Sequence, residues 1–92
     1  MLKIEYSPKF TRVYKKLPKQ VKDKAEEKEK LFRKNPFDPK LKTHKLTGRL
    51  KKYWAFSVGY QCRIVFSLIS KNKVRFHTIG SHSIYKKFIG IL

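Results

Sequence analysis

The residues of this sequence that could carry out catalysis are histidines, arginines and tyrosines rather than carboxylates. Its three histidines are His44, His77 and His82, and the last acidic residue is Asp38, so that no Asp or Glu occurs in residues 39–92. Histidine transfers protons near neutral pH, and arginine binds phosphate through a planar, permanently charged group. This chemistry suits metal-independent cleavage of RNA, in which a base deprotonates the 2′-hydroxyl and an acid protonates the leaving 5′-oxygen. We therefore expect any reaction on this part of the chain to proceed without carboxylates.

The sequence lacks the patterns of several other kinds of site. Three histidines with few nearby acids give no metal-ligand set of recognisable spacing, so we expect no metal and no other cofactor. There is no glycine-rich phosphate loop and no evident Ser-His-Asp arrangement. The single cysteine, Cys62, alternates with apolar residues, which favours a place in the core over a role as nucleophile.

The charge of the chain predicts an anionic partner. Lys and Arg total 24 against 6 Asp and Glu, which gives a formal net charge of +18. This surplus repels itself in the free protein, and we favour nucleic acid as the partner that relieves the repulsion, over an acidic protein or a merely soluble basic surface. A membrane is disfavoured, because no apolar run approaches the roughly 18–20 residues of a spanning helix. The first residues lack a hydrophobic signal region, which predicts a cytoplasmic protein.

The pattern of apolar residues predicts the elements that must position these side chains. Alternation over 2–6 predicts a short strand, and helical spacing predicts helices over 8–17 and 18–34. After a basic connecting stretch, residues 35–52, three further strands are expected over 53–58, 61–69 and 73–79, joined by short turns as an antiparallel meander.

The two faces of this predicted sheet differ in character. The inward face is expected to hold Trp54, Phe56, Val58, Cys62, Ile64, Phe66, Leu68, Val74 and Phe76. The other face is expected to be open, basic and aromatic, with Tyr53, Ser57, Gln61, Arg63, Arg75 and His77. Such a face suits a phosphate backbone with bases stacked on it. The order β-α-α-β-β-β predicts a single α+β domain over residues 1–92, with a helical pair packed on one face of an antiparallel sheet.

Four segments carry a resemblance to a known family. They are residues 44–48 (HKLTG), 53–54 (YW), 59–66 (GYQCRIVF) and 79–85 (IGSHSIY). In this order they resemble the RelE/ParE toxin superfamily, and most of all the YafQ- and YoeB-like mRNA interferases of type II toxin–antitoxin systems. The resemblance covers nearly the whole chain and implies a RelE-like fold.

The resemblance implies roles for individual residues. His44 stands at the position of a general base just before a Leu-Thr-Gly turn. Arg63 matches a strand arginine that contacts the scissile phosphate. His82 matches a residue that acts as acid or phosphate ligand, and Tyr85 or Phe88 matches an aromatic that stacks on or orients the RNA. We expect the catalytic set to be His44, Arg63, His82 and Tyr85. We expect the RNA-binding set to be Lys45, Arg49, Lys51, Lys52, Arg75, His77 and Phe88.

The function implied by the resemblance is a toxin that cuts messenger RNA. The protein would act as a ribosome-dependent endoribonuclease in the decoding site of the 30S subunit, with its helical pair and loop lysines resting on ribosomal RNA. An antitoxin would neutralise it, and we expect that antitoxin to be acidic and to fold as it wraps the basic surface.

The sequence also departs from the family pattern. Gln61 and Ser83 stand where many relatives carry an acid, and Trp54 and Phe56 replace the lysine pair of RelE itself. These departures leave proton transfer to the two histidines with implied roles. They also keep open a second hypothesis, in which the chain is a non-catalytic RNA-binding homologue or a ParE-like inhibitor of DNA gyrase.

Overall fold

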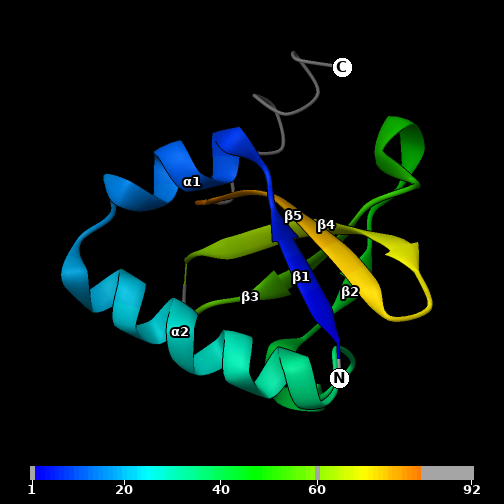
Figure 1. Cartoon of the computed structure of the whole chain (residues 1–92), viewed down its shortest axis with the longest axis horizontal. Helices are drawn as coiled ribbons and strands as arrows, with labels where there is room; N and C mark the ends of the chain where they lie inside the picture. The colour runs from blue at the N-terminus through cyan, green and yellow to red at the C-terminus, as the bar shows by residue number, and fades with distance from the viewer. Residues whose placement is uncertain (1, 60, 82–92) are drawn as a thin grey trace.

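Two helices and a five-stranded sheet make up the computed structural model, which describes residues 2–59 and 61–81 (Figure 1). The strands are β1 (Lys3–Tyr6), β2 (His44–Lys45), β3 (Trp54–Ser57), β4 (Arg63–Ser70) and β5 (Lys73–Gly80). The helices are α1 (Pro8–Lys15), α2 (Lys19–Lys34) and the short 3-10 helices η1 (Pro39–Leu41) and η2 (Gly48–Leu50). The predicted α+β class and the helical pair are confirmed. Within the described residues, no helix is both long enough and apolar enough to span a membrane.

The sheet is mixed, and not antiparallel throughout as we expected. Its strand order is β1-β5-β4-β3-β2, and β3, β4 and β5 form the predicted antiparallel meander. The first strand pairs with β5 in parallel, with Ile4 opposite Val74. Ser7 fixes this arrangement, because its N–H donates to the Phe76 carbonyl at 3.0 Å and its hydroxyl donates to the His77 carbonyl at 2.8 Å.

The connecting stretch contains a strand that the sequence pattern did not predict. Strand β2 pairs antiparallel with β3 at the edge of the sheet, with His44 opposite Ala55 and Lys45 opposite Trp54. Two residues are too few to show an alternation of apolar and polar side chains, so periodicity could not reveal this strand.

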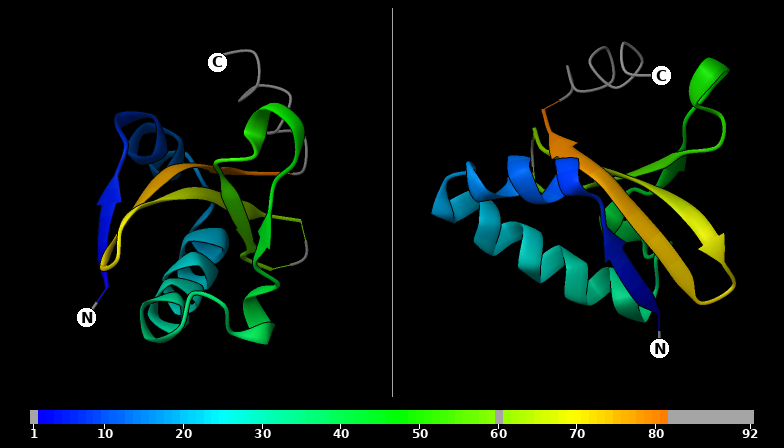
Figure 2. Two further views of the ribbon diagram at one scale, coloured as in Figure 1. Left: turned by 90° about the vertical axis from the view of Figure 1, so that its right-hand side faces the viewer. Right: turned by 45° about the horizontal axis from the view of Figure 1, so that its top comes forward.

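Both helices lie against the same face of the sheet (Figures 1 and 2). Helix α1 begins at Pro8 after an N-cap, because the Ser7 hydroxyl accepts a hydrogen bond from the N–H of Phe10 at 2.9 Å. Helix α2 ends before Asn35 and Pro36, where the proline cannot continue it. One side chain then anchors α2 to the sheet.

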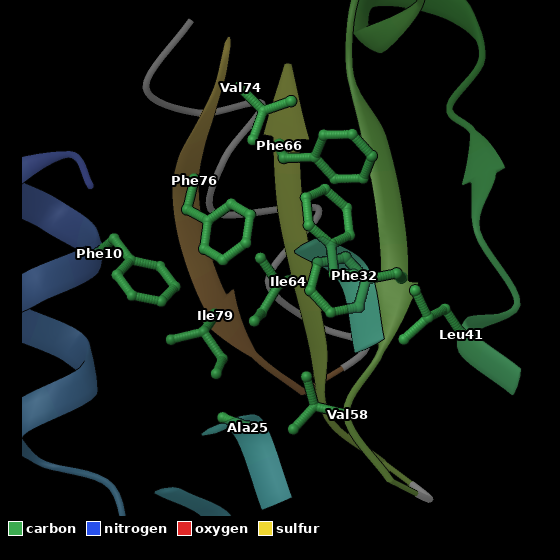
Figure 3. Close-up of a cluster of buried hydrophobic side chains, with 11 residues drawn as sticks. Phe10, Ala25, Phe32, Leu41, Val58, Ile64, Phe66, Val74, Phe76 and Ile79 are labelled. Atoms are coloured by element: carbon green, nitrogen blue, oxygen red, sulfur yellow. The ribbon is translucent and has the colours of Figure 1, made fainter. Parts of the chain in front are cut away.

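That anchor is Phe32, at the centre of a cluster of aromatic rings (Figure 3). Its ring centroid lies 4.7 Å from that of Phe56, 4.9 Å from that of Phe66 and 5.3 Å from that of Phe76. All four rings are fully buried. Phe56, Phe66 and Phe76 come from β3, β4 and β5, so the predicted inward face of the meander is confirmed at its centre.

A second hydrophobic cluster covers part of the face that we expected to be open. Leu46, Leu50, Ala55 and Val65 are all buried there, and Tyr53 packs against them. The chain folds back after β2, so that η2 and the helical pair lie on opposite sides of the sheet (Figure 2). The expectation of an uncovered face is therefore wrong over the middle of the sheet.

Two residues of the predicted inward face sit differently from the rest. Leu68 is 50% exposed, because it lies near the tip of the β4–β5 hairpin, where the register shifts between Leu68 and Ser70. Cys62 is half-buried beside the first cluster, and burial raises the pKa of its thiol. A protonated, packed thiol fits the expected structural role.

Candidate active site

The edge strand β2 holds His44 out in solvent. Its Nδ1 lies 3.1 Å from the carbonyl oxygen of Lys42. Because a carbonyl only accepts, Nδ1 must donate, which assigns the proton to Nδ1 and leaves Nε2 as the basic nitrogen. The backbone thus orients the exposed His44 ring, and Nε2 is the ring nitrogen that does not face Lys42.

Arg63 opens strand β4 and is held by a serine on the neighbouring strand. One of its guanidinium N–H groups donates to the Ser57 hydroxyl at 2.9 Å, and the two residues are also paired across the sheet. Arg63 is half-buried, while Ser57 is buried. A guanidinium has five N–H donors in a fixed fork, so one bond to Ser57 orients the group while others can meet a phosphate.

The strand register places these two side chains on one face of the sheet. His44 lies opposite Ala55, which lies opposite Val65, whereas Arg63 lies opposite Ser57, two positions further along β3. Two strand spacings and two residues amount to about 10 Å across the sheet and about 7 Å along it. His44 and Arg63 are therefore not in direct contact, but a bound RNA backbone could reach both.

His77 lies on the same face, inside an irregularity of strand β5. Val65 pairs with Thr78 and Phe66 pairs with Phe76, which leaves His77 as the extra residue of a β-bulge. Its Nε2 shares a 2.7 Å hydrogen bond with the Ser67 hydroxyl. Burial, and then the charge of Arg75, lower the pKa of His77, which favours its neutral form.

The aromatic partner of His77 is Tyr53, whose ring meets the imidazole edge-on at a centroid distance of 5.1 Å. This ring also packs on the second hydrophobic cluster. Tyr53 and Ser67 together hold His77 in place, so the predicted RNA contact would come from a fixed imidazole.

One carboxylate from outside residues 39–92 reaches this face of the sheet. Strand β1 brings Glu5 opposite Arg75, and Glu5 forms ion pairs with Arg75 and, at 3.1 Å, with Lys73. Hydrogen bonds from Lys73 and Arg75 lower the pKa of Glu5, so it stays ionised. Glu5 lies at the β1 edge, opposite the β2 edge that holds His44. It neutralises part of the charge that Arg75 was expected to offer to RNA.

The basic residues of the loop are spread over two faces. Lys45 points to the helix side of the sheet, where its Nζ lies 6.0 Å from the ring centroid of Trp54. Arg49, Lys51 and Lys52 are exposed on and beside η2. The three loop cations thus stand beside the covered face, and Lys45 stands apart from them.

The C-terminal part of the predicted site falls outside the described residues. This applies to His82, Tyr85 and Phe88, whose expected roles stay predictions. Among the residues that the structure does describe, no three His, Cys, Asp or Glu side chains are grouped so that they could hold a metal ion.

Sequence reasoning missed the side chains that hold the candidate residues in place. Ser57 orients Arg63, and Ser67 orients His77. It also missed the second cluster, although the unbroken apolar runs 54–56 and 64–66 indicated strands buried on both faces.

The family profile described as "Bacterial toxin of type II toxin-antitoxin system, YafQ" matches residues 2–87 of the chain. A comparison with curated protein sequences gives no significant match.

Solved structures give a consistent picture. The crystal structure of YafQ from E. coli strain BL21(DE3) superposes with a TM-score of 0.75 at 25% identity, and covers 92% of this chain and 98% of that chain. The E. coli DinJ–YafQ toxin–antitoxin complex gives a TM-score of 0.72 at 25% identity, and the match covers 90% of this chain and 94% of that chain. The YoeB/ParE toxin from Agrobacterium tumefaciens shares the fold, with a TM-score of 0.74 at 16% identity and 88% and 99% covered.

Proposed function

Because this chain belongs to the YafQ family of bacterial toxins of type II toxin–antitoxin systems, as its sequence motifs predicted, we propose that it is a metal-independent endoribonuclease that cleaves messenger RNA on the ribosome. The observation that supports the proposal is that an oriented histidine, His44, and an oriented arginine, Arg63, lie on the same face of the sheet within the span of a bound RNA backbone.

In the proposed reaction, His44 acts as the general base. Its Nε2 removes the proton of a 2′-hydroxyl, and the 2′-oxygen then attacks the neighbouring phosphorus. Arg63 stabilises the charge of the phosphorane. The bond from phosphorus to the 5′-oxygen breaks, and His82 protonates that oxygen, while Tyr85 or Phe88 orients the RNA. The products are a 2′,3′-cyclic phosphate and a 5′-hydroxyl, and no metal or cofactor takes part.

We also propose that an acidic antitoxin binds the protein and blocks this activity. The net charge of +18 supports such a partner, and the related E. coli YafQ has been solved in complex with its antitoxin DinJ. Co-expression with a candidate acidic protein should give a complex that elutes together in gel filtration and restores growth.

Cleavage can be tested in a reconstituted translation reaction with primer extension on a defined message. Wild-type protein should produce cuts within the reading frame that carry a 5′-hydroxyl. His44→Ala, His82→Ala and Arg63→Ala should each slow cleavage by about 100-fold or more. Lys71→Ala, which changes an exposed cation at the tip of the β4–β5 hairpin, is the matched control and should cleave normally.

Intact messages with folded, antitoxin-free wild-type protein would contradict the proposal. So would cuts that persist in the His44→Ala/His82→Ala double variant. In either case, a DNA supercoiling assay with gyrase would test the ParE-like alternative, which the absence of acids at Gln61 and Ser83 motivates.

A further inference from the structure

An aromatic side chain stands exposed in the loop between α2 and η1. Phe37 is 50% exposed, one of the few large hydrophobic residues on the described surface. Its ring meets that of Trp54 edge-on, with centroids 5.2 Å apart and an interplanar angle of 75°. Trp54 in turn lies nearly parallel to the buried ring of Phe66. The core therefore supports Phe37 from one side, while much of its ring faces solvent.

The loop around Phe37 is fixed by hydrogen bonds. The N–H of Phe37 donates to the side-chain oxygen of Asn35 at 3.0 Å, and the N–H of Asp38 donates to the Asn35 carbonyl at 3.1 Å. The Thr43 hydroxyl donates to the Pro36 carbonyl at 2.5 Å, which ties this turn to the residue just before His44. An exposed ring held in this way loses little conformational entropy when a ligand stacks on it.

The surroundings of Phe37 are basic. Four exposed lysines flank the turn in the sequence or lie on the adjacent strand: Lys34, Lys40, Lys42 and Lys45. The Nζ of Lys45 lies over the ring of Trp54. Asp38 is the only acid after residue 29, and its side chain accepts the N–H of Lys40 at 2.9 Å. Aromatic rings among cations suit single-stranded nucleic acid, whose bases stack while its phosphates meet the lysines.

The turn also lies close to the candidate general base. His44 and Lys45 are successive residues of β2, about 3.8 Å apart at Cα, and their side chains point to opposite faces of the sheet. An RNA strand that crosses the β2 edge would thus have a phosphate near His44 and a neighbouring nucleotide near Lys45 and Trp54.

We propose that Phe37, supported by Trp54 and Lys45, is a stacking site for a base of the substrate RNA next to the scissile phosphate. The inference deepens the proposed function and rests on it. It assigns base stacking to the helix side of the sheet, where Lys45 of the expected RNA-binding set lies.

The sole tryptophan of the chain makes this site directly observable, because Trp54 lies against Phe37. The probe is a single-stranded 2′-O-methyl oligoribonucleotide of about six nucleotides, which cannot undergo 2′-hydroxyl attack. Titration of the full chain should quench Trp54 emission, and anisotropy of a labelled probe should give the Kd. Phe37→Ala should weaken binding about 5- to 150-fold, as the loss of one stacked base predicts.

Two control variants separate stacking from general effects. Phe37→Tyr keeps a ring and should bind like the wild type. Ile69→Ala removes an equally exposed apolar side chain on β4 and should also bind like the wild type. An abasic oligomer of the same length keeps the phosphates, so wild type and Phe37→Ala should bind it equally.

Equal affinity of wild type and Phe37→Ala for the base-containing probe would overturn the inference. So would a loss of affinity in Phe37→Tyr as large as that in Phe37→Ala. These outcomes are independent of catalysis. If translated messages are cut normally by Phe37→Ala and binding is unchanged, the proposed function stands and the stacking site falls. If stacking is observed but wild-type protein leaves messages intact, the stacking site stands and the nuclease proposal falls.

Discussion

At the scale of single residues, the hydrogen bond from Arg63 to Ser57 orients the guanidinium that we propose contacts the scissile phosphate. Ser57→Ala removes the acceptor and leaves Arg63 able to rotate away from a bound phosphate. We expect kcat/KM for cleavage to fall about tenfold, which corresponds to the ~1.4 kcal/mol of a well-placed hydrogen bond, with a similar or smaller loss in stability. Single-turnover cleavage, with denaturant unfolding in parallel, measures both.

The control for this variant is Ser70→Ala, which alters an exposed serine at the far end of β4. It should leave both quantities unchanged. If Ser57→Ala cleaves at the wild-type rate, Arg63 does not depend on this bond for its position.

His77 makes folding stability depend on pH. Its pKa in the folded protein lies below the ordinary value of 6.5, because burial and the nearby Arg75 disfavour its charged form. As the pH falls, the unfolded chain therefore binds a proton before the folded one does. The contribution of His77 is complete above about pH 7.5 and is lost as the pH falls through 6.5 toward the lower folded value.

We expect Tm to fall between about pH 7.5 and pH 5.5 in the wild type, and to fall less in His77→Gln. Glu5→Gln is the contrasting variant. The pKa of Glu5 is lowered from 4.5, so the stability it contributes is present above 4.5 and is lost only below that pH. Replacement of Glu5 by Gln should keep the fall in Tm in this window and deepen it, because the negative charge of Glu5 raises the pKa of His77 in the folded protein. Identical pH profiles for wild type and His77→Gln would show that His77 does not titrate with folding.

At the scale of elements, the second hydrophobic cluster joins the η2 loop to the sheet. Leu50 is buried on η2 against Ala55 and Val65. Leu50→Ala should cost about 2–4 kcal/mol in the free energy of unfolding. It should also raise KM, because Arg49, Lys51 and Lys52 lose their fixed position.

Urea unfolding and cleavage kinetics measure the two effects, and Leu68→Ala is the matched control. Leu68 is half-exposed at the hairpin tip, so its truncation should change stability by no more than about 0.5 kcal/mol. A fully stable Leu50→Ala protein would mean that η2 is held by other contacts.

The sequence allowed the elements with strong periodicity to be predicted, and failed where a pairing depends on the whole chain. Helices α1 and α2 and the meander β3–β5 follow from apolar spacing, caps and prolines. The parallel partner of β1 lies about 70 residues away in the chain, and no local pattern encodes that pairing. Within the candidate site, His44 and Arg63 were proposed from family motifs, whereas the contact that orients Arg63, with Ser57, depends on strand register and could not be predicted.

At the scale of the whole molecule, a net charge of +18 predicts that the proposed RNA binding depends strongly on salt. Each cation that contacts a phosphate of single-stranded RNA contributes about 0.7 to the slope of log K against log salt concentration. Lys51→Gln/Lys52→Gln should therefore lower the slope by about 1.4. Fluorescence anisotropy of an uncleavable oligoribonucleotide over a salt series measures it.

The comparison for this pair is Lys15→Gln/Lys16→Gln at the end of α1, which removes the same charge from exposed positions on a helix that packs on β5, away from the β2 edge. A short RNA bound at the β2 edge would not reach these lysines. The slope of log K against log salt concentration for this double variant should therefore match that of the wild type. Equal reductions for the two pairs would mean that the RNA is held by overall charge and not by the loop.

The parallel pairing of β1 with β5 also has a consequence for the timing of synthesis. Residues 3–6 find their partner only when residues 73–76 are available, and Ser7 is tied to Phe76 and His77. A nascent chain that has emerged only as far as α2 has two amphipathic helices and no sheet on which to bury them. The sheet can be completed only after β5 has left the exit tunnel, so β1 is joined to the strands that position His44 and Arg63 only after residues 73–76 have been made.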